Sequence, residues 1–239
     1  MDEDPADASE ANALNLVFTE TTIPVPRVRR VIERQWNHLI VMDYIPGSTL
    51  AEVWSTYSIW KKLGVAFTLR RHIRQLQRLK ASRTTPPGPL SIQGPRQCEN
   101  PGIFSQVRSR RGPFASYAEL SMWFNGRCQL AMNHHKVPED HPHRKTRFDD
   151  SAPLVFAHQD LNPRNIIVGE DGRLWIVDWA WAGYYPVWFE YVAMLSQGEH
   201  ESSIGNVYKY WDHLIPFICG PYFEQERWMS MIAMGLYYR

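Results

Sequence analysis

His158, Asp160, Asn165 and Asp178 are the side chains of this chain whose types and spacing could carry out chemistry together. The carboxylate of Asp160 could hold an attacking hydroxyl and accept its proton. The amide oxygen of Asn165 and the carboxylate of Asp178 are oxygen ligands of the kind that Mg²⁺ takes together with phosphate oxygens. Because phosphate transfer depends mainly on positioning and charge neutralisation, these residue types predict chemistry on a phosphate group.

Two short apolar runs must position these groups. Residues 165–168 (Asn-Ile-Ile-Val) and 174–177 (Leu-Trp-Ile-Val) predict two buried strands. The pair Asp171-Gly172 between them is a strong signal for a two-residue hairpin turn. We therefore expect an antiparallel hairpin whose two open ends carry the proposed metal ligands.

The turn also predicts the register of this hairpin. If Glu170 lies opposite Arg173, Asn165 lies opposite Asp178, and Cβ atoms of directly opposed residues are roughly 5 Å apart. That separation suits two ligands of one cation. A bulge at Gly169 would shift the register by one residue. The alternative is a polar loop before an ordinary hairpin, with Asp178 capping the segment that follows it.

The stretch from Val155 to Val168, with 176–179 (Ile-Val-Asp-Trp) and Ala182-Gly183, resembles the aminoglycoside phosphotransferase family, and its fungal branch most closely. Further matches extend the resemblance over residues from about 10 to 195 and lie at 23–26 (Ile-Pro-Val-Pro), 41–50 and 112–117. The resemblance implies an α+β, two-lobed protein-kinase-like fold with a mainly helical C-terminal lobe. It also implies ATP and magnesium as cofactors and phosphate transfer to a small-molecule hydroxyl.

The family's site residues map onto this sequence position by position. Asp160 matches the catalytic base, Asn165 and Asp178 match the metal ligands, and His158 matches a residue that braces the loop. The sequence departs from the family at Gln159, where glycine is usual.

A second departure is Ala180, near which the family commonly has an acidic residue. The resemblance further implies that Met42, Asp43, Tyr44 and Ile45 form the hinge whose backbone binds adenine. An ordinary transition from strand to loop is the alternative for this segment.

The first part of the chain lacks two features that a kinase small lobe uses to hold phosphates. The first glycine is Gly47 and the first lysine is Lys61, so neither a glycine-rich loop nor a lysine can precede Met42. We expect residues 1–47 to be a remnant of the nucleotide-binding lobe, with its first strands missing, and residues 48–239 to be the large catalytic lobe. Two alternatives to an active enzyme follow: a catalytically impaired kinase-like binding module, or a truncated gene product.

Composition narrows the class of protein. A net charge of +1 argues against nucleic acid or an anionic membrane as a dominant partner. The three cysteines are widely spaced, without a Cys-x-x-Cys pair, which favours reduced thiols in the cytoplasm. No apolar run reaches the roughly 20 residues that cross a bilayer, and no signal peptide is evident. We expect a cytoplasmic protein whose partners are nucleotide and a hydroxylated small molecule. The acceptor and the oligomeric state stay open.

Periodicity predicts the remaining elements. Apolar residues at helical spacing, Ala11, Leu14, Val17 and Phe18, indicate a first helix, with Glu10 in a capping box that starts at Asp7. The other expected elements are an antiparallel pair at 28–33 and 38–44 with 39–42 buried on both faces, helices beginning near Thr49 and spanning 60–80 and 117–132, an irregular loop at 84–102, and a helical tail at 211–238.

Three segments carry residues that suggest more specific functions. The helix at 60–80 has an arginine-rich face, for which a solvated surface is favoured over RNA binding because no aromatic platform accompanies it. Four histidines within residues 134–143 are assigned to a polar surface loop in preference to a metal site, since their spacing is irregular. The aromatic residues after Asp178 are assigned mainly to core packing, with an acceptor-binding platform as the alternative.

Overall fold

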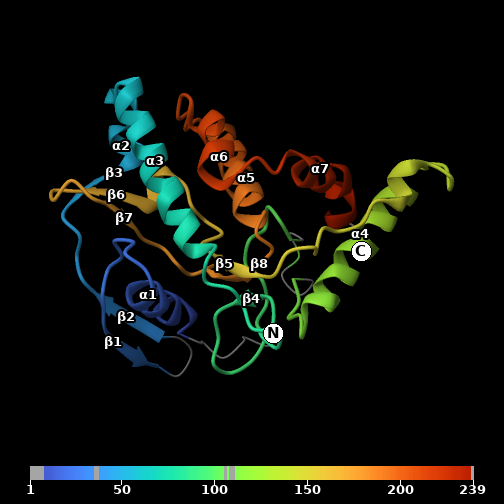
Figure 1. Ribbon diagram of the computed structural model, residues 1–239, viewed down its shortest axis with the longest axis horizontal. Coiled ribbons are helices and arrows are strands. Elements are labelled where there is room, and N and C mark those ends of the chain that lie inside the picture. The colour runs from blue at the N-terminus through green and yellow to red at the C-terminus, as the bar shows by residue number, and fades with distance from the viewer. Residues whose placement is uncertain (1–7, 35–37, 105–106, 108–110, 238–239) are drawn as a thin grey trace.

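The computed structural model describes residues 8–34, 38–104, 107 and 111–237. It combines helices with small antiparallel sheets, as the α+β prediction requires (Figure 1). At one end lie α1 and the β1–β2 pair, and at the other end α4 extends away from the body. The helices are α1 (Ser9–Glu20), α2 (Leu50–Val53), α3 (Ile59–Leu76), α4 (Tyr117–His134), α5 (Phe189–Ser203), α6 (Trp211–Cys219) and α7 (Phe223–Tyr237).

The predicted first helix is confirmed as α1, which buries Ala11, Leu14 and Val17. Phe18 was expected on the same face but is 49% exposed, and the guanidinium of Arg27 lies over its ring. The buried stripe includes the small residue at position 13 instead, so the helix face that packs inward is rotated away from Phe18. The expected capping aspartate lies outside the described residues.

Strands β1 (Val28–Glu33) and β2 (His38–Met42) form the predicted antiparallel pair. Burial of β2 on both faces is wrong, because Leu39 and Val41 are exposed. In the described structure the pair forms a two-stranded sheet, and α1 contacts β1. One face of β2 therefore stays open to solvent, which the continuous apolar run could not reveal.

Strands β3 (Gly47–Thr49), β6 (Ile166–Gly169) and β7 (Leu174–Ile176) form a three-stranded antiparallel sheet. The hairpin between β6 and β7 is confirmed, but its two-residue turn is wrong. The amide of Gly169 donates to the carbonyl of Arg173, and Gly172 has φ of 76°, so three residues form the loop. A left-handed glycine at the third loop position is the usual alternative to a two-residue turn.

A second sheet has the order β4–β8–β5 and consists of β4 (Gly88–Pro89), β5 (Val155–Ala157) and β8 (Gly183–Tyr185). Apart from β4, the loop predicted at 84–102 is irregular. The expected helical tail is two helices, since Gly220 and Pro221 separate α6 from α7. Within the described residues, no helix has both the length and the apolar character needed to cross a membrane.

The core joins these elements. Helix α2 begins with a capping box in which the Thr49 side chain accepts from Glu52 and the Glu52 carboxylate accepts from Thr49. Helix α3 packs on α6, and α4 packs on α7. The aromatic residues that follow Asp178 are largely buried, which confirms core packing for them: Trp179, Tyr185, Trp188, Phe189 and Tyr191.

Candidate active site

The Asp160 carboxylate lies in a loop between β5 and β6, and two amides hold it in place. Asn165 Nδ2 donates to Asp160 Oδ2 at 2.9 Å and to its carbonyl oxygen at 2.9 Å. Asn162 Nδ2 donates to Asp160 Oδ1 at 3.1 Å, while Asn162 Oδ1 accepts from the amide of Arg164 at 2.9 Å. Both carboxylate oxygens are therefore oriented by groups that follow Asp160 within one short turn, η4 (Pro163–Asn165).

His158 connects this loop to the end of β7. Its Nδ1 accepts from the amide of Asp160 at 3.2 Å, so the ring proton is on Nε2, which donates to the carbonyl of Val177 at 3.0 Å. Complete burial lowers the pKa of His158 to about 4, which keeps the ring neutral. The edge of the ring also packs against Trp179, with centroids 4.5 Å apart. His158 therefore links the backbone of the Asp160 loop to the end of β7, and its role in the reaction stays a prediction.

Asp178 follows β7 with a left-handed backbone, at φ of 63°. The amide of Val177 donates to the carbonyl of Asn165 at 3.0 Å, so Asn165 lies opposite Val177 and the predicted opposition to Asp178 is wrong by one residue. Burial raises the pKa of Asp160 to about 6, and the negative charge of Asp178 adds to that rise. The two carboxylates are therefore electrostatic neighbours even though the register differs.

The side-chain oxygen atoms of Asn165 and Asp178 are of the kind that magnesium binds. The Asn165 amide nitrogen is occupied by Asp160, which leaves its oxygen as the available ligand atom. Among the described residues, no group of three or more His, Cys, Asp or Glu side chains is arranged to hold a metal ion. Magnesium commonly uses one or two protein oxygens and takes the rest from phosphates and water, so a two-ligand site remains appropriate for it.

Glu10 reaches the same region from α1. The capping box expected between Glu10 and Asp7 lies outside the described residues. Glu10 Oε1 accepts from the amide of Trp179 at 3.3 Å. Burial raises the pKa of Glu10, and the charge of Asp178 raises it further. A contact over this sequence distance leaves no local sequence signal.

Glu190 and Gln159 are buried residues of the site that sequence reasoning did not assign to it. Glu190 Oε2 accepts from the backbone amides of His158 and Gln159 at 2.6 and 3.1 Å. Gln159 has a φ of 70°, which explains why glycine would be favoured there. Its side chain is fully buried, and neither of its polar atoms has a partner. The departure from glycine was the one available signal; Glu190 has none in its spacing.

A second buried carboxylate lies behind the loop. Arg164 Nη2 is 2.8 Å from Glu201 Oε1, and the Glu201 side chain is 1% exposed. Glu201 Oε2 also accepts from Asn206 at 2.9 Å. The last turn of α5 therefore ties down the residue that precedes Asn165. The sequence distance between Arg164 and Glu201 hid this contact from pattern analysis.

The predicted hinge lies apart from these contacts. Met42 ends β2, and the amide of Asp43 already donates to the carbonyl of Arg27 at 3.1 Å. The Asp43 carboxylate pairs with Arg29, Tyr44 is 85% exposed and Ile45 is buried. Asp43, Tyr44 and Ile45, but not Met42, line a hollow of about 440 Å³ together with Pro46, Glu170, Asp171 and Trp175. Adenine binding at Met42, Asp43, Tyr44 and Ile45 stays a prediction.

Several solved structures are similar to this chain at low sequence identity. Aminoglycoside phosphotransferase APH(4)-Ia is 12% identical, with a TM-score of 0.44 over 96% of this chain and 82% of that one. Macrolide 2'-phosphotransferase MphH from Brachybacterium faecium is 14% identical, with a TM-score of 0.44 over 96% and 72%. The AMP-bound spectinomycin phosphotransferase APH(9)-Ia is 13% identical, with a TM-score of 0.45 over 96% and 72%.

The family of this chain follows from a match to a family model and not from these weak structural similarities. No curated protein matches the chain. The model of the phosphotransferase enzyme family, APH, matches residues 2–216. That match covers α1, the loop that holds Asp160 and the hairpin that ends before Asp178, and it brings the kinase-like fold of the family with it. The chain belongs to the APH family of phosphotransferase enzymes.

Proposed function

We propose that this phosphotransferase-family protein transfers a phosphate group from ATP to a hydroxyl of a small molecule and that the reaction depends on magnesium. The observation that carries the proposal is the Asp160 carboxylate, held on both oxygens by Asn162 and Asn165 and placed beside the charge of Asp178. A carboxylate that accepts a proton from a substrate hydroxyl must be held in one orientation, and these contacts hold Asp160 in this way.

Asp160 acts as the base in this proposal. Its pKa of about 6 leaves it mostly ionised at neutral pH, yet close enough to neutrality to accept a hydroxyl proton. His158 stays neutral and holds the loop through its two ring nitrogens, and Glu190 holds the backbone of the residues on either side of the His158–Gln159 peptide. These contacts hold the backbone on the N-terminal side of Asp160 in place.

Asn165 and Asp178 are the residues that would hold magnesium. When bound, the cation neutralises phosphate oxygens and lowers the repulsion between them and the attacking group. Asp178 suits this role because its negative charge lies close enough to Asp160 to raise the pKa of that carboxyl group beyond the effect of burial. Met42, Asp43, Tyr44 and Ile45 would contact the nucleotide base, and the acceptor would be a hydroxylated small molecule. We place this reaction in the cytoplasm.

A second candidate function is a kinase-like binding module without catalytic activity. The observation that favours it is the absence of any lysine before Lys61 and any glycine before Gly47. Glu10, which matches the helix glutamate that would pair with such a lysine, binds the amide of Trp179 instead. A module of this kind would retain the Asp160 loop as a structural element.

Replacement of Asp160 by asparagine separates the two functions. The assay is phosphate transfer from ATP across a panel of hydroxylated small molecules, with and without magnesium. We expect Asp160→Asn to lower transfer by about 10²- to 10⁴-fold, the usual contribution of a positioned base. Asp178→Asn should weaken the dependence of the rate on magnesium.

Asp140→Asn is the matched control, because Asp140 is an exposed aspartate in the loop after α4. It should leave transfer unchanged, and all three variants should keep their melting temperature within a few degrees. Transfer that survives Asp160→Asn rejects the assigned base. No transfer by the unaltered chain to any acceptor, together with measurable nucleotide binding, favours the binding module.

A further inference from the structure

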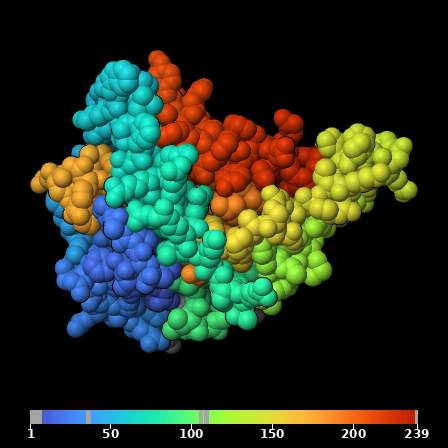
Figure 2. All heavy atoms as spheres, viewed as in Figure 1, coloured from blue at the N-terminus to red at the C-terminus, as the bar shows by residue number. Residues whose placement is uncertain are grey.

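Helix α3 and the turn that follows it carry four arginines on one side. Arg70 and Arg71 are adjacent, and Arg74 and Arg78 follow at spacings of three and four residues, so the four arginines lie within about 12 Å along the helical direction. Among the described residues, none of the four forms an ion pair with a carboxylate. Figure 2 shows α3 at the surface, between the N-terminal segment in blue and the C-terminal helices in red.

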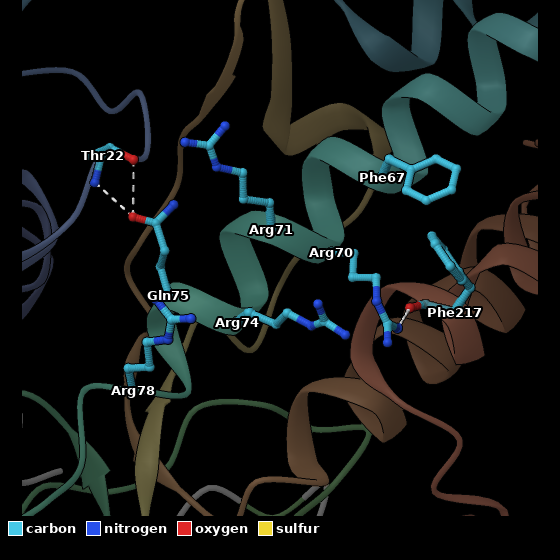
Figure 3. A pocket seen from close by; sticks show the side chains of 8 residues that line it. All are labelled: Thr22, Phe67, Arg70, Arg71, Arg74, Gln75, Arg78 and Phe217. Carbon is cyan, nitrogen blue, oxygen red and sulfur yellow. Dashed lines mark hydrogen bonds between the residues drawn. The ribbon is translucent and has the colours of Figure 1, made fainter.

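The arginines line a hollow of about 450 Å³ and are not spread over a flat solvated face. Figure 3 shows that Arg71 and Arg78 extend toward the side where Thr22 lies, while Arg74 extends toward Arg70. Arg70 is fixed in place, because its Nη1 donates to the carbonyl of Phe217 and its guanidinium stacks 4.7 Å from the centre of that ring. The expectation of a solvated face on a core helix is confirmed, since Arg71, Arg74 and Arg78 are exposed, and this face is in addition hollowed.

Two neutral polar groups complete the wall between Arg71 and Arg78. The side-chain oxygen of Gln75 accepts from the Thr22 amide at 2.8 Å and from its hydroxyl at 3.1 Å. These bonds use the oxygen of Gln75 and leave its NH₂ group as a donor on the same surface. At the other end of the hollow, Phe67 and Phe217 meet edge to face with centroids 4.8 Å apart. The lining therefore offers N–H donors and positive charge and contains no carboxylate.

Folding does not require this concentration of charge. The opposite face of α3 packs into the core through Leu69, Ile73 and Leu76, which are fully buried. Like charges one turn apart destabilise a helix, as for Arg70 with Arg74. The whole chain has a net charge of only +1, so four unneutralised charges in one hollow are a local excess. A bound anion would remove the repulsion that the fold leaves in place.

The hollow is also distinct from the candidate active site. Its lining comes from the end of α1, the outer face of α3 and α6, and includes no residue of the Asp160 loop or of the β6–β7 hairpin. The buried face of α3 lies in the same core cluster as Leu161 and Ile166, so α3 itself separates the hollow from that loop.

We propose that this hollow binds a small anion with several phosphate groups. Guanidinium groups bind phosphate oxygens through paired N–H donors, and each phosphate brings up to two negative charges. Several phosphates close together match arginines on successive turns better than a single carboxylate would. A soluble polyphosphate and the phosphorylated headgroup of an inositol lipid share this chemistry. The proposal does not depend on phosphate transfer at Asp160.

Titration calorimetry with two soluble probes, inorganic tripolyphosphate and inositol hexakisphosphate, tests the proposal on the full chain. We expect binding that weakens as salt is raised, because ion pairs at this surface are screened. Arg74→Gln should lower the affinity by about ten- to hundred-fold, the usual effect of losing one charge-assisted contact. Arg74→Lys, which keeps the charge but loses the paired donors, should fall between the native chain and Arg74→Gln.

Arg227→Gln is the matched control, since Arg227 is an exposed arginine on α7, away from the hollow. It should leave the affinity unchanged, and a melting curve for each variant checks folding. Phosphatidylcholine vesicles that carry phosphatidylinositol bisphosphate identify the source: binding to vesicles that Arg74→Gln weakens supports the lipid headgroup, and binding to soluble probes alone supports a free anion.

Three results overturn the proposal. One is the failure of both soluble probes and the vesicles to bind. Another is binding that Asp178→Asn alters and Arg74→Gln does not, which would place the anion in the candidate active site. The third is binding of single-stranded RNA that requires Arg74, with no binding of the small probes, which would assign this face to nucleic acid.

Discussion

Glu190 is a fully buried carboxylate whose one oxygen accepts two backbone amides of the Asp160 loop, while its other oxygen has no partner. Burial raises its pKa to about 7, against the lowering effect of the two amide bonds, and the charge of Asp160 adds to the rise. Burial raises the pKa values of Tyr185 and Cys219, and the charge of Glu190 adds to both rises. At neutral pH this carboxyl group therefore lies close to the midpoint of its titration.

Stability should follow this titration. The folded pKa of Glu190 is raised above its ordinary value of 4.5, so the stabilising contribution is complete below about pH 4.5 and is lost as the pH rises through about 7. Glu190→Gln cannot ionise. We expect the native chain to lose on the order of 2 kcal/mol of unfolding free energy between pH 5 and pH 8 relative to Glu190→Gln, which urea denaturation at the two pH values would measure.

Glu20→Gln provides the comparison, because Glu20 is an exposed glutamate at the end of α1. Its stability should follow the native chain at both pH values. Parallel curves for the native chain and Glu190→Gln would show that Glu190 does not titrate in this range and would remove it as a pH-sensitive support of the loop.

Helices α4 and α7 pack so closely that only glycine fits at position 235. A Cβ added to Gly235 of α7 would lie 2.1 Å from the carbonyl oxygen of Arg127 in α4, which is backbone and cannot rotate away. By contrast, a Cβ added to Gly126 of α4 meets nothing within 4 Å. Gly235 is required by the close approach of α7 to α4, whereas Gly126 has no such requirement and only lowers the stability of its helix.

Alanine at these two positions should therefore change stability in opposite directions. We expect Gly235→Ala to lower the unfolding free energy by about 1–3 kcal/mol, because the helices must move apart. Gly126→Ala should raise it by up to about 1 kcal/mol, since alanine favours the helix over glycine. Chemical denaturation of both variants measures the difference. Equal effects of the two substitutions would contradict the close contact of α7 with Arg127.

Local patterns predicted the elements better than the contacts between them. The Asp160, Asn165 and His158 contacts follow from spacing, because all three residues lie in one short loop. The Asp-Gly pair predicted the β6–β7 hairpin but not its loop length, since that pair suits two-residue and three-residue loops alike.

Contacts over long sequence distances had no such signal. Glu190 supports the loop from 31 or 32 residues away, and Glu201 contacts Arg164 from α5. The exposure of β2 likewise depends on what covers the sheet, and its apolar sequence is the same whether one face or both are buried. Sequence periodicity describes which residues avoid water, and it cannot identify their partners.

At the scale of the whole molecule, the described part of the chain places most of its core in the large helical region and little around β1 and β2. The two strands expose Val31, Ile32, Leu39 and Val41, whereas α2, α3 and the β6–β7 hairpin share one continuous core. The boundary between the lobes near residue 47 stays a prediction. Because the β1–β2 part of the described chain is small, it has few groups that could bind a nucleotide.

Two arginines near the predicted hinge, Arg27 and Arg29, are engaged with other side chains. Arg29 forms two hydrogen bonds to the carboxylate of Asp43, at 2.5 and 3.0 Å, and both side chains are exposed. Arg27 lies over the ring of Phe18. Both guanidinium groups are thus engaged on the surface of the strands, and arginine is a poor replacement for the compact charge of a lysine.

We therefore expect this chain to bind ATP weakly. It has no lysine before Lys61 and no glycine before Gly47, and the loss of one charge-assisted phosphate contact typically costs about 1.5–3 kcal/mol, or roughly ten- to hundred-fold in affinity. Calorimetry with ATP, with and without magnesium, should give a dissociation constant weaker than about 1 µM, a value that corresponds to roughly 8 kcal/mol of binding free energy. Asp178→Asn should remove any gain from magnesium, while Asp140→Asn should not. Micromolar or tighter binding would contradict the prediction and would require another cation, with Arg29 and Arg27 the first to replace by glutamine.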